Sequence, residues 1–182
     1  AGAGCVGTDN ITPCATGGTC SGGTGGGGSG GATKSGKALT TYKNQTVNTG
    51  GDFYSVSNED NVALAQPLLE TTATTLTVGG SLVDVKGTLA ANDAANPFIF
   101  LDPTTFTATS LLGMSGGGSM TAATTFFKDL QGTLTLTGDA LSVSGNSSLS
   151  GAGAAAFLAL DGSTMAVTGN VLNATGAKST VT

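Results

Sequence analysis

The sequence contains no histidine, no arginine and no tryptophan, and only 9% of its 182 residues are charged. Without histidine, a serine or cysteine nucleophile lacks its usual general base, and neither a GxSxG elbow nor a P-loop ending occurs. Polysaccharide-cleaving β-helices pair carboxylates with Arg or Lys, and arginine is absent here. We therefore expect a protein that is not an enzyme, with no catalytic residues and no cofactor.

Positive charge is scarce as well, with six lysines against eleven Asp and Glu, a net charge of −5 and an isoelectric point near 4.2. Nucleic-acid binding depends on clustered Lys and Arg, so we expect no nucleic-acid partner. No apolar run approaches the ~20 residues that span a bilayer, and we predict a chain that does not span a membrane. A hydrophobic content of 38% argues against disorder.

Three cysteines, Cys5, Cys14 and Cys20, lie close together near the N-terminus. Without histidine, three thiolates are one ligand short of a zinc site. We expect one disulfide among them, with the third cysteine free or bridging to another chain. The segment 21–31, SGGTGGGGSGG, is typical of a flexible linker, although glycines also serve where backbones approach closely. We predict a Cys-containing, Gly-rich arm over 1–31, a lead-in over 32–45 and a repeat β domain over 46–182.

The abundant feature of the sequence is a repeat. TLTVGGSLVDVKG at 75–87 returns in altered form as TLTLTGDALSVSG at 133–145, and further copies lie ~29 residues apart. Two apolar columns follow this spacing: Tyr54, Val83, Leu112, Leu141 and Leu172, then Val56, Val85, Met114, Val143 and Ala174. Within 81–86 the pattern has period two, which predicts that Val83 and Val85 face inward while Leu82 and its alternates face outward.

Two further columns indicate turns. Asn58 and the glycines Gly87, Gly116, Gly145 and Gly176 share one position, which predicts a left-handed turn used in every unit. A second position holds short polar residues that we expect to bond their own backbone: Asp52, Ser81, Ser110, Asp139 and Asn170.

A fixed spacing repeated along the chain favours one architecture. It predicts an all-β protein, a β-solenoid of about five ~29-residue coils with three short strands each, because equivalent coils can stack and bury a common core. A β-sandwich or jelly roll is the alternative, since it requires only alternating strands.

Two other columns suggest binding sites. Glu70, Asp102 and Asp161, with Asp129 nearby, could stack as a carboxylate ladder for calcium, or could serve as turn caps; no DxDxDG-type loop occurs, and we expect no metal site. Thr46, Thr75, Thr104, Thr133 and Thr164 form a threonine column similar to those of antifreeze proteins. The parallel column, Asn48, Thr77, Phe106, Thr135 and Ala166, lacks Thr in three of five units.

Phrases such as GTLTLTGDALSVSG and MAVTGNVLNATG resemble the rungs of autotransporter passengers and other secreted adhesins, and are similar to phage tail spike and fibre modules. The resemblance implies a non-catalytic structural role outside the cell, at the cell surface or in a virion.

The last unit ends in GAKSTVT, with no capping helix and with Lys178 as its one cation. Uncovered strand edges pair with other chains, and end-to-end contacts build open filaments. We therefore expect a structural subunit whose partners are copies of itself, assembled into an extracellular filament or surface matrix. The alternatives are a phage or virus fibre that binds a cell-surface or glycan receptor and, more distantly, an ice-binding solenoid.

Overall fold

The computed structural model describes residues 38–152 and 156–182. Within these ranges the chain forms eighteen strands and no helix, which confirms the all-β prediction. Because no helix occurs there, none is available that could cross a membrane.

The strands group into five successive coils. The first coil holds β1 (Thr40–Lys43), β2 (Thr46–Thr49), β3 (Tyr54–Val56) and β4 (Asn61–Leu64). The second holds β5 (Leu69–Val78), β6 (Ser81–Val85) and β7 (Thr88–Ala91), and the third β8 (Ile99–Ala108), β9 (Ser110–Met114) and β10 (Ser119–Ala122). The fourth holds β11 (Phe127–Leu130), β12 (Thr133–Leu136), β13 (Leu141–Val143) and β14 (Ser148–Gly151). The fifth holds β15 (Leu158–Asp161), β16 (Thr164–Val167), β17 (Leu172–Ala174) and β18 (Thr180–Val181).

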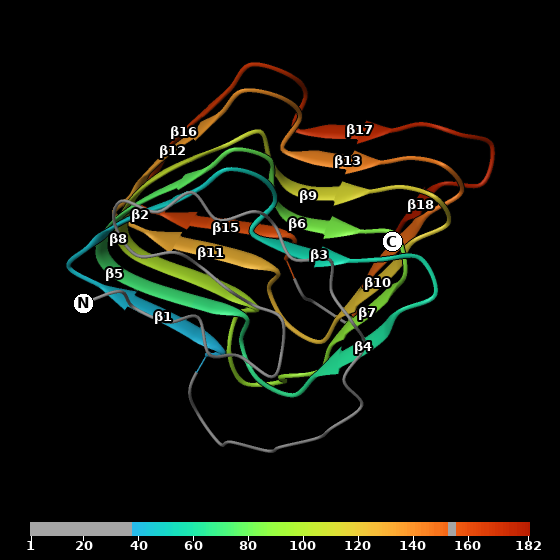
Figure 1. Ribbon diagram of the computed structural model, residues 1–182, viewed down its shortest axis with the longest axis horizontal. Coiled ribbons are helices and arrows are strands. Elements are labelled where there is room, and N and C mark those ends of the chain that lie inside the picture. Colours follow the sequence, from blue (N-terminus) through green and yellow to red (C-terminus); the bar gives the residue numbers. More distant parts are fainter. Residues whose placement is uncertain (1–37, 153–155) are drawn as a thin grey trace.

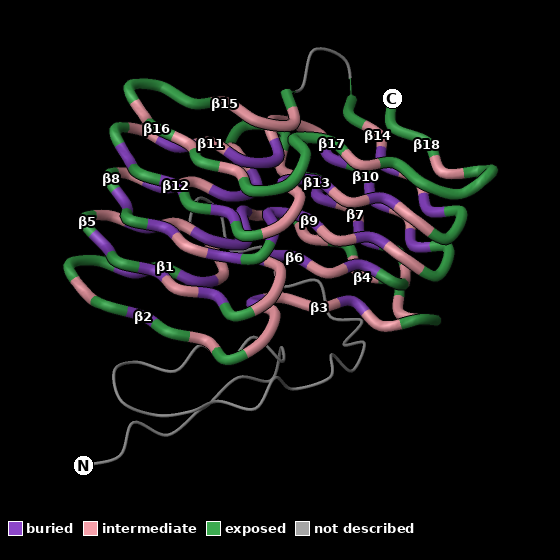
Figure 2. The backbone as a smooth tube through the Cα atoms, turned by 90° about the horizontal axis from the view of Figure 1, so that it is seen from above, coloured by how far each residue is buried: buried purple, intermediate pink, exposed green. Residues whose placement is uncertain are grey.

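Each coil contributes to three parallel sheets, so the molecule is a β-solenoid and the sandwich alternative is wrong (Figure 1). The first sheet contains β1-β5-β8-β11-β15, with β2, β12 and β16 along its second half. The second sheet is β3-β6-β9-β13-β17, and the third is β4-β7-β10-β14-β18. Viewed from the side, the coils lie one above another in chain order (Figure 2). The stretch expected as a lead-in supplies β1, which pairs with β5 and belongs to the first coil.

The two apolar columns that indicated the repeat lie in register in the second sheet. Val83 pairs with Leu112 and Leu112 with Leu141, while Val85 pairs with Met114 and Met114 with Val143. All six of these side chains are buried. The columns continue at both ends, from Tyr54 and Val56 below to Leu172 and Ala174 above. Val56 is also buried, whereas Leu172 and Ala174 in the last coil are exposed.

Leu82 differs from its prediction, because it is completely buried and does not face outward. It belongs to a third apolar column at the corner that leads into the second sheet: Phe53, Leu82, Leu111, Ala140 and Val171. Consecutive residues at a corner can both face the interior, so the strict alternation of a flat strand fails there. A phenylalanine stack lines another corner, where the Phe98 and Phe126 ring centres lie 5.7 Å apart and those of Phe126 and Phe157 4.9 Å apart.

The repeated turn is only partly as predicted. Gly116, Gly145 and Gly176 have left-handed backbones, with φ of 65°, 63° and 102°. In the first coil the left-handed residue is Glu59, at φ 73°, and not Asn58. Gly87 is not left-handed; a Cβ there would collide with the Ser57 and Asp60 carbonyl oxygens of the coil below. Only Lys86 and Gly87 separate β6 from β7, so this corner is tighter than its counterparts.

We expect Leu112→Ala to destabilise the fold by roughly 2–5 kcal/mol, because Leu112 is fully buried and truncation leaves a cavity. The control is Leu172→Ala in the same column, where the side chain is 49% exposed and its truncation should cost much less. Urea unfolding followed by circular dichroism measures both variants at low protein concentration. Equal losses of unfolding free energy in the two variants would contradict burial by stacking.

Candidate functional site

The last coil leaves one end of the stack uncovered by the described residues. Each of its strands pairs with a strand of the fourth coil and, within residues 38–152 and 156–182, with no other strand. One row of backbone N–H and C=O groups therefore faces away from the stack along all three sheets. Such a row is a template for pairing with another strand unless charges, prolines or bulges protect it.

The same coil exposes apolar side chains whose counterparts in lower coils are buried. Leu160 is 37% exposed, Val171 58%, Leu172 49% and Val181 40%, and these are the exposed large hydrophobic residues of the described chain. In the fourth coil their column neighbours Ala140, Leu141 and Leu149 are all buried. The terminal coil thus presents an unburied cross-section of the core. Exposed patches of this kind mark interaction surfaces.

A polar column extends to the same end. Asp52 and Asp139 were expected to bond their own turns, but each carboxylate accepts a hydrogen bond from the coil above. The Asp52 Oδ1 accepts from the Ser81 amide at 2.7 Å, and the Asp139 Oδ1 accepts from the Asn170 amide at 2.7 Å. The Asn173 side-chain amide also donates to Asp139, at 2.6 Å. These bonds stabilise the carboxylate, and the Asn170 amide, then the Asn173 amide, lower the pKa of Asp139.

The acidic residues considered for calcium are not brought together. Glu70 pairs with Phe100, whereas Asp102 pairs with Thr72. Glu70 and Asp102 therefore lie in different columns, two residue positions apart along the strands. Asp161 pairs with Leu130, so a leucine separates its coil from that of Asp102. Across the described ranges, no group of three or more acidic or cysteine side chains is placed to hold a metal ion. Cys5, Cys14 and Cys20 lie outside the described residues.

The threonine array is more regular than the sequence indicated. Thr105, and not Thr104, occupies the first column, because Thr104 pairs with Thr74. The second column consequently contains Thr107 in place of Phe106, whose side chain is buried. Three neighbouring strands therefore present complete Thr-x-Thr pairs on the outer face of the first sheet: Thr75 and Thr77, Thr105 and Thr107, Thr133 and Thr135. The pairs are incomplete in the first and last coils, where Asn48 and Ala166 occupy the second column in place of threonine.

A shallow pocket of about 310 Å³ lies beside this array. Its walls are Ala73, Pro103, Gln131, Gly132 and the neighbouring threonines. The described residues that line it include no aromatic side chain. We assign it no ligand.

A buried carboxyl group lies beneath the same sheet. Asp129 is fully buried, and neither of its carboxylate oxygens has a hydrogen-bond partner among the described residues. Burial raises the pKa of Asp129, and the negative charge of Asp102 adds to the shift, while the nearby Ser163 hydroxyl and Gly132 amide oppose it. Tyr42, three coils further down in the same column, also has a buried hydroxyl with no hydrogen-bond partner among the described residues, and burial raises its pKa. The sequence placed Asp129 beside a carboxylate ladder, as a calcium ligand or a turn cap, and did not predict its burial.

Comparison with known proteins gives no relative: no family model, no curated protein and no solved structure matches this chain.

We expect Asp129→Asn to stabilise the protein at neutral pH. The native pKa of Asp129 is raised above the unfolded value of ~3.9, so the native state binds the proton more tightly. Stability should fall as pH rises from ~4 through the native pKa, and the Asn variant should lack this loss. Urea unfolding at pH 3 and pH 7 measures the difference, which should be larger at pH 7.

Asp139→Asn provides a control of opposite sign. Because its native pKa is lowered, Asp139 contributes stability above ~pH 4 that disappears as pH falls through the native pKa. Its removal should therefore weaken the protein at pH 7 and matter little at acidic pH. An Asp129→Asn variant whose advantage over the wild type does not change with pH would show that this carboxyl titrates normally.

Proposed function

We propose that this protein is a non-enzymatic structural subunit that polymerises end to end into an extracellular filament or surface matrix. Its partners are further copies of the same chain. The observation that carries the proposal is the last coil. It combines edges on three parallel sheets that pair with no further described strand and the exposed side chains of Leu160, Val171, Leu172 and Val181.

A second copy satisfies such an end better than a partner of unrelated shape. Its coils have the same three-sided outline and strand directions as the coil that they would meet. Strand addition of this type obtains its affinity from backbone hydrogen bonds and its specificity from side-chain contacts. The contact is heterologous, because the last coil of one molecule meets the first coil of the next, and repetition without closure gives a filament.

The composition of residues 156–182 offers little protection against this pairing. Residues 156–182 contain no proline, and their two charged residues are Asp161 and Lys178. Monomeric solenoids place a polar cap over their terminal coils. Another molecule that covered these strands would bury their apolar side chains. Full burial of one large apolar side chain contributes roughly 1.5–3 kcal/mol of free energy.

Electron microscopy of the purified full-length chain tests the proposal. We expect fibres whose length grows with protein concentration, with a subunit repeat along the fibre of roughly five coils at ~4.8 Å each. Val171→Lys should shorten or abolish the fibres, because it introduces a charge into the apolar end surface. Thr105→Lys, on the outer face of the first sheet, is the control and should polymerise normally. Discrete short rods at all concentrations would contradict the proposal and favour a fibre module that acts as a single unit.

A second candidate function, ice binding, is favoured by the register of the threonine array. The six paired threonines form a regular hydroxyl lattice, with rows roughly 4.8 Å apart and side chains within a row roughly 6.6 Å apart. This arrangement resembles the Thr-x-Thr faces of antifreeze proteins. We expect measurable thermal hysteresis if the face binds ice, and its loss in Thr105→Lys but not in Val171→Lys. Absence of hysteresis in the wild type would eliminate this candidate.

A further inference from the structure

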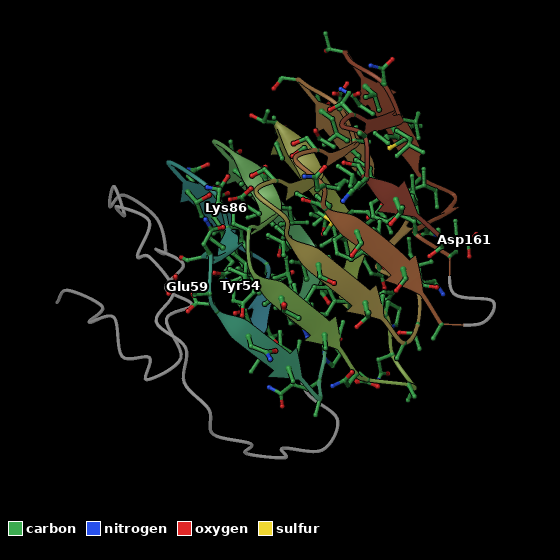
Figure 3. The ribbon with its side chains drawn as sticks, turned by 90° about the vertical axis from the view of Figure 1, so that its right-hand side faces the viewer. Tyr54, Glu59, Lys86 and Asp161 are labelled. Carbon is green, nitrogen blue, oxygen red and sulfur yellow. The ribbon has the colours of Figure 1, made fainter. Side chains whose placement is uncertain are left out.

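Two carboxyl groups of the fourth coil, those of Asp129 and Asp139, lie beneath the fifth coil and respond to it in opposite ways. We propose that the fifth coil, residues 156–182, is a pH-sensitive flap, which stays closed on the fourth coil while Asp129 is neutral and Asp139 is charged, and which detaches locally when Asp129 ionises. The closure of this coil does not depend on whether the chain polymerises. Figure 3 shows the fifth coil at one end of the stack, where Asp161 is labelled.

The Asp129 side chain is enclosed between two coils. In the first sheet Asp129 pairs with Leu101 below and with Leu160 above. Asp129 and Leu101 are fully buried. A Cβ at Gly132 would collide with both carboxylate oxygens of Asp129, so the carboxyl group occupies the space that a side chain at position 132 would fill. Among the described residues, only the fifth coil lies above this carboxyl group in the stack.

The hydrogen bonds around Asp129 leave its charged form without donors. Neither carboxylate oxygen has a hydrogen-bond partner among the described residues. The Ser163 hydroxyl of the fifth coil lies close, but it accepts from the Gly132 amide at 3.1 Å and donates to the backbone carbonyl oxygen of Asp129, also at 3.1 Å. A buried carboxylate without donors costs far more free energy than the neutral carboxyl group, so burial here favours the protonated form.

The charged groups near Asp129 do not offset this cost. The strands packed against it contribute Asp102 from β8 and the exposed Asp161 from β15, and both are acidic. After burial, the negative charge of Asp102 raises the pKa of Asp129 further. Lys128, on β11 itself, alternates with the buried Phe127 and Asp129 and faces outward. The remaining strands of the fourth coil, β12, β13 and β14, contain no titratable side chain. Ionisation of Asp129 is relieved most directly when the fifth coil opens and water reaches the carboxylate.

Asp139 holds the same coil through its charge. Its Oδ1 accepts from the Asn170 backbone amide at 2.7 Å, and its Oδ2 accepts from the Asn173 side-chain amide at 2.6 Å. Both donors belong to the fifth coil, so opening of the coil breaks both bonds. The strands around these bonds, β9, β12, β13, β16 and β17, contain no titratable side chain. Ionised Asp139 therefore favours the closed coil, and its protonation weakens closure.

The fifth coil is the part of the described chain where local opening costs least. Its strands pair with strands of the fourth coil and with no other described strand. Val171 is 58% exposed and Leu172 49% exposed even when the coil is closed, so opening uncovers little further apolar surface. Segments with few buried apolar contacts open at low free energy, well before the whole molecule unfolds.

The two carboxyl groups define the pH range in which the flap is closed. The closed state holds the Asp129 proton more tightly than the open state, because burial raises the pKa of Asp129. From ~pH 4, where an exposed carboxyl group titrates, up to this raised pKa, each pH unit should shift the equilibrium about tenfold toward the open state. Below ~pH 4 the lowered pKa of Asp139 acts in the reverse sense, because protonation weakens its bonds to Asn170 and Asn173. Closure should therefore be strongest near ~pH 4.

Amide hydrogen exchange of the full-length chain tests the flap. Exchange is followed from ~pH 2.5 to ~pH 8 at low protein concentration, with rates corrected for the chemical pH dependence of exchange. We expect the protection of residues 156–182 to peak near ~pH 4, to fall about tenfold per pH unit on the alkaline side and then to level off. Asp129→Asn should abolish the alkaline fall, and Asp139→Asn should abolish the acidic fall. Glu70→Gln is the control, because Glu70 lies opposite the buried Thr71 on the outer face of the same sheet, and it should retain both.

The wild-type profile alone is sufficient to overturn the proposal. Protection of residues 156–182 that stays constant between ~pH 4 and ~pH 8 would show that the coil does not detach when Asp129 ionises. A ¹³C NMR titration of the wild-type Asp129 carboxyl group gives a second readout that needs no variant, and an ordinary titration near ~pH 4 would overturn the proposal as well.

The variants assign the two limbs of the profile. An alkaline fall that persists in Asp129→Asn, in a variant that circular dichroism shows to be folded, would place the switch on another group and overturn the role of Asp129. An acidic fall that persists in Asp139→Asn would overturn the role of Asp139. Loss of each limb in its own variant, with both limbs kept in Glu70→Gln, supports the flap.

Discussion

The backbone ladder that joins each coil to the next is the interaction on which the rest of this structure depends. Parallel pairing fixes equivalent residues directly above one another, so that any side chain repeated in the sequence becomes a continuous column in space. A single coil could therefore not bury Leu112 or Val85. Each coil is too thin to enclose a core, and the apolar interior exists only because neighbouring coils cover one another.

The same ladder explains how a chain with few charges can remain specific. The described residues contain a single ion pair, between Lys86 and Asp84 at 3.1 Å on the surface of β6. Alignment is instead maintained by hydroxyls and carboxylates that bond from coil to coil. Examples are the Ser110 hydroxyl, which donates to that of Ser81 at 2.8 Å, and the Asp52 carboxylate. The buried hydroxyls of Thr71 and Thr104, 2.6 Å apart, perform this role inside the first sheet.

The solenoid, its number of coils and its two main core columns could be predicted from the sequence, because a fixed spacing repeats through the strands of the second sheet. The corners could not. Thr104 and Thr105 exchange roles because the third coil has one more residue before its threonine pair, and a constant step along the sequence cannot detect compensating length changes. The prediction for Leu82 was wrong because it assumed the inward and outward alternation of a flat strand, whereas Leu82 lies at a bend. Asp52 formed bonds to the next coil that only the stacked structure brings within reach.

The uneven burial of the coils determines where the molecule begins to unfold. Contacts run almost entirely between adjacent coils. Each coil is therefore stabilised by its immediate neighbours along the axis, as in a one-dimensional chain. The fifth coil has a described neighbour on one side only, and its side chains Val171 and Leu172 gain little from it. Local opening should begin there and advance downward through the fourth coil. Amide hydrogen exchange would accordingly be fastest in β17 and β18 and slowest in β8 and β9.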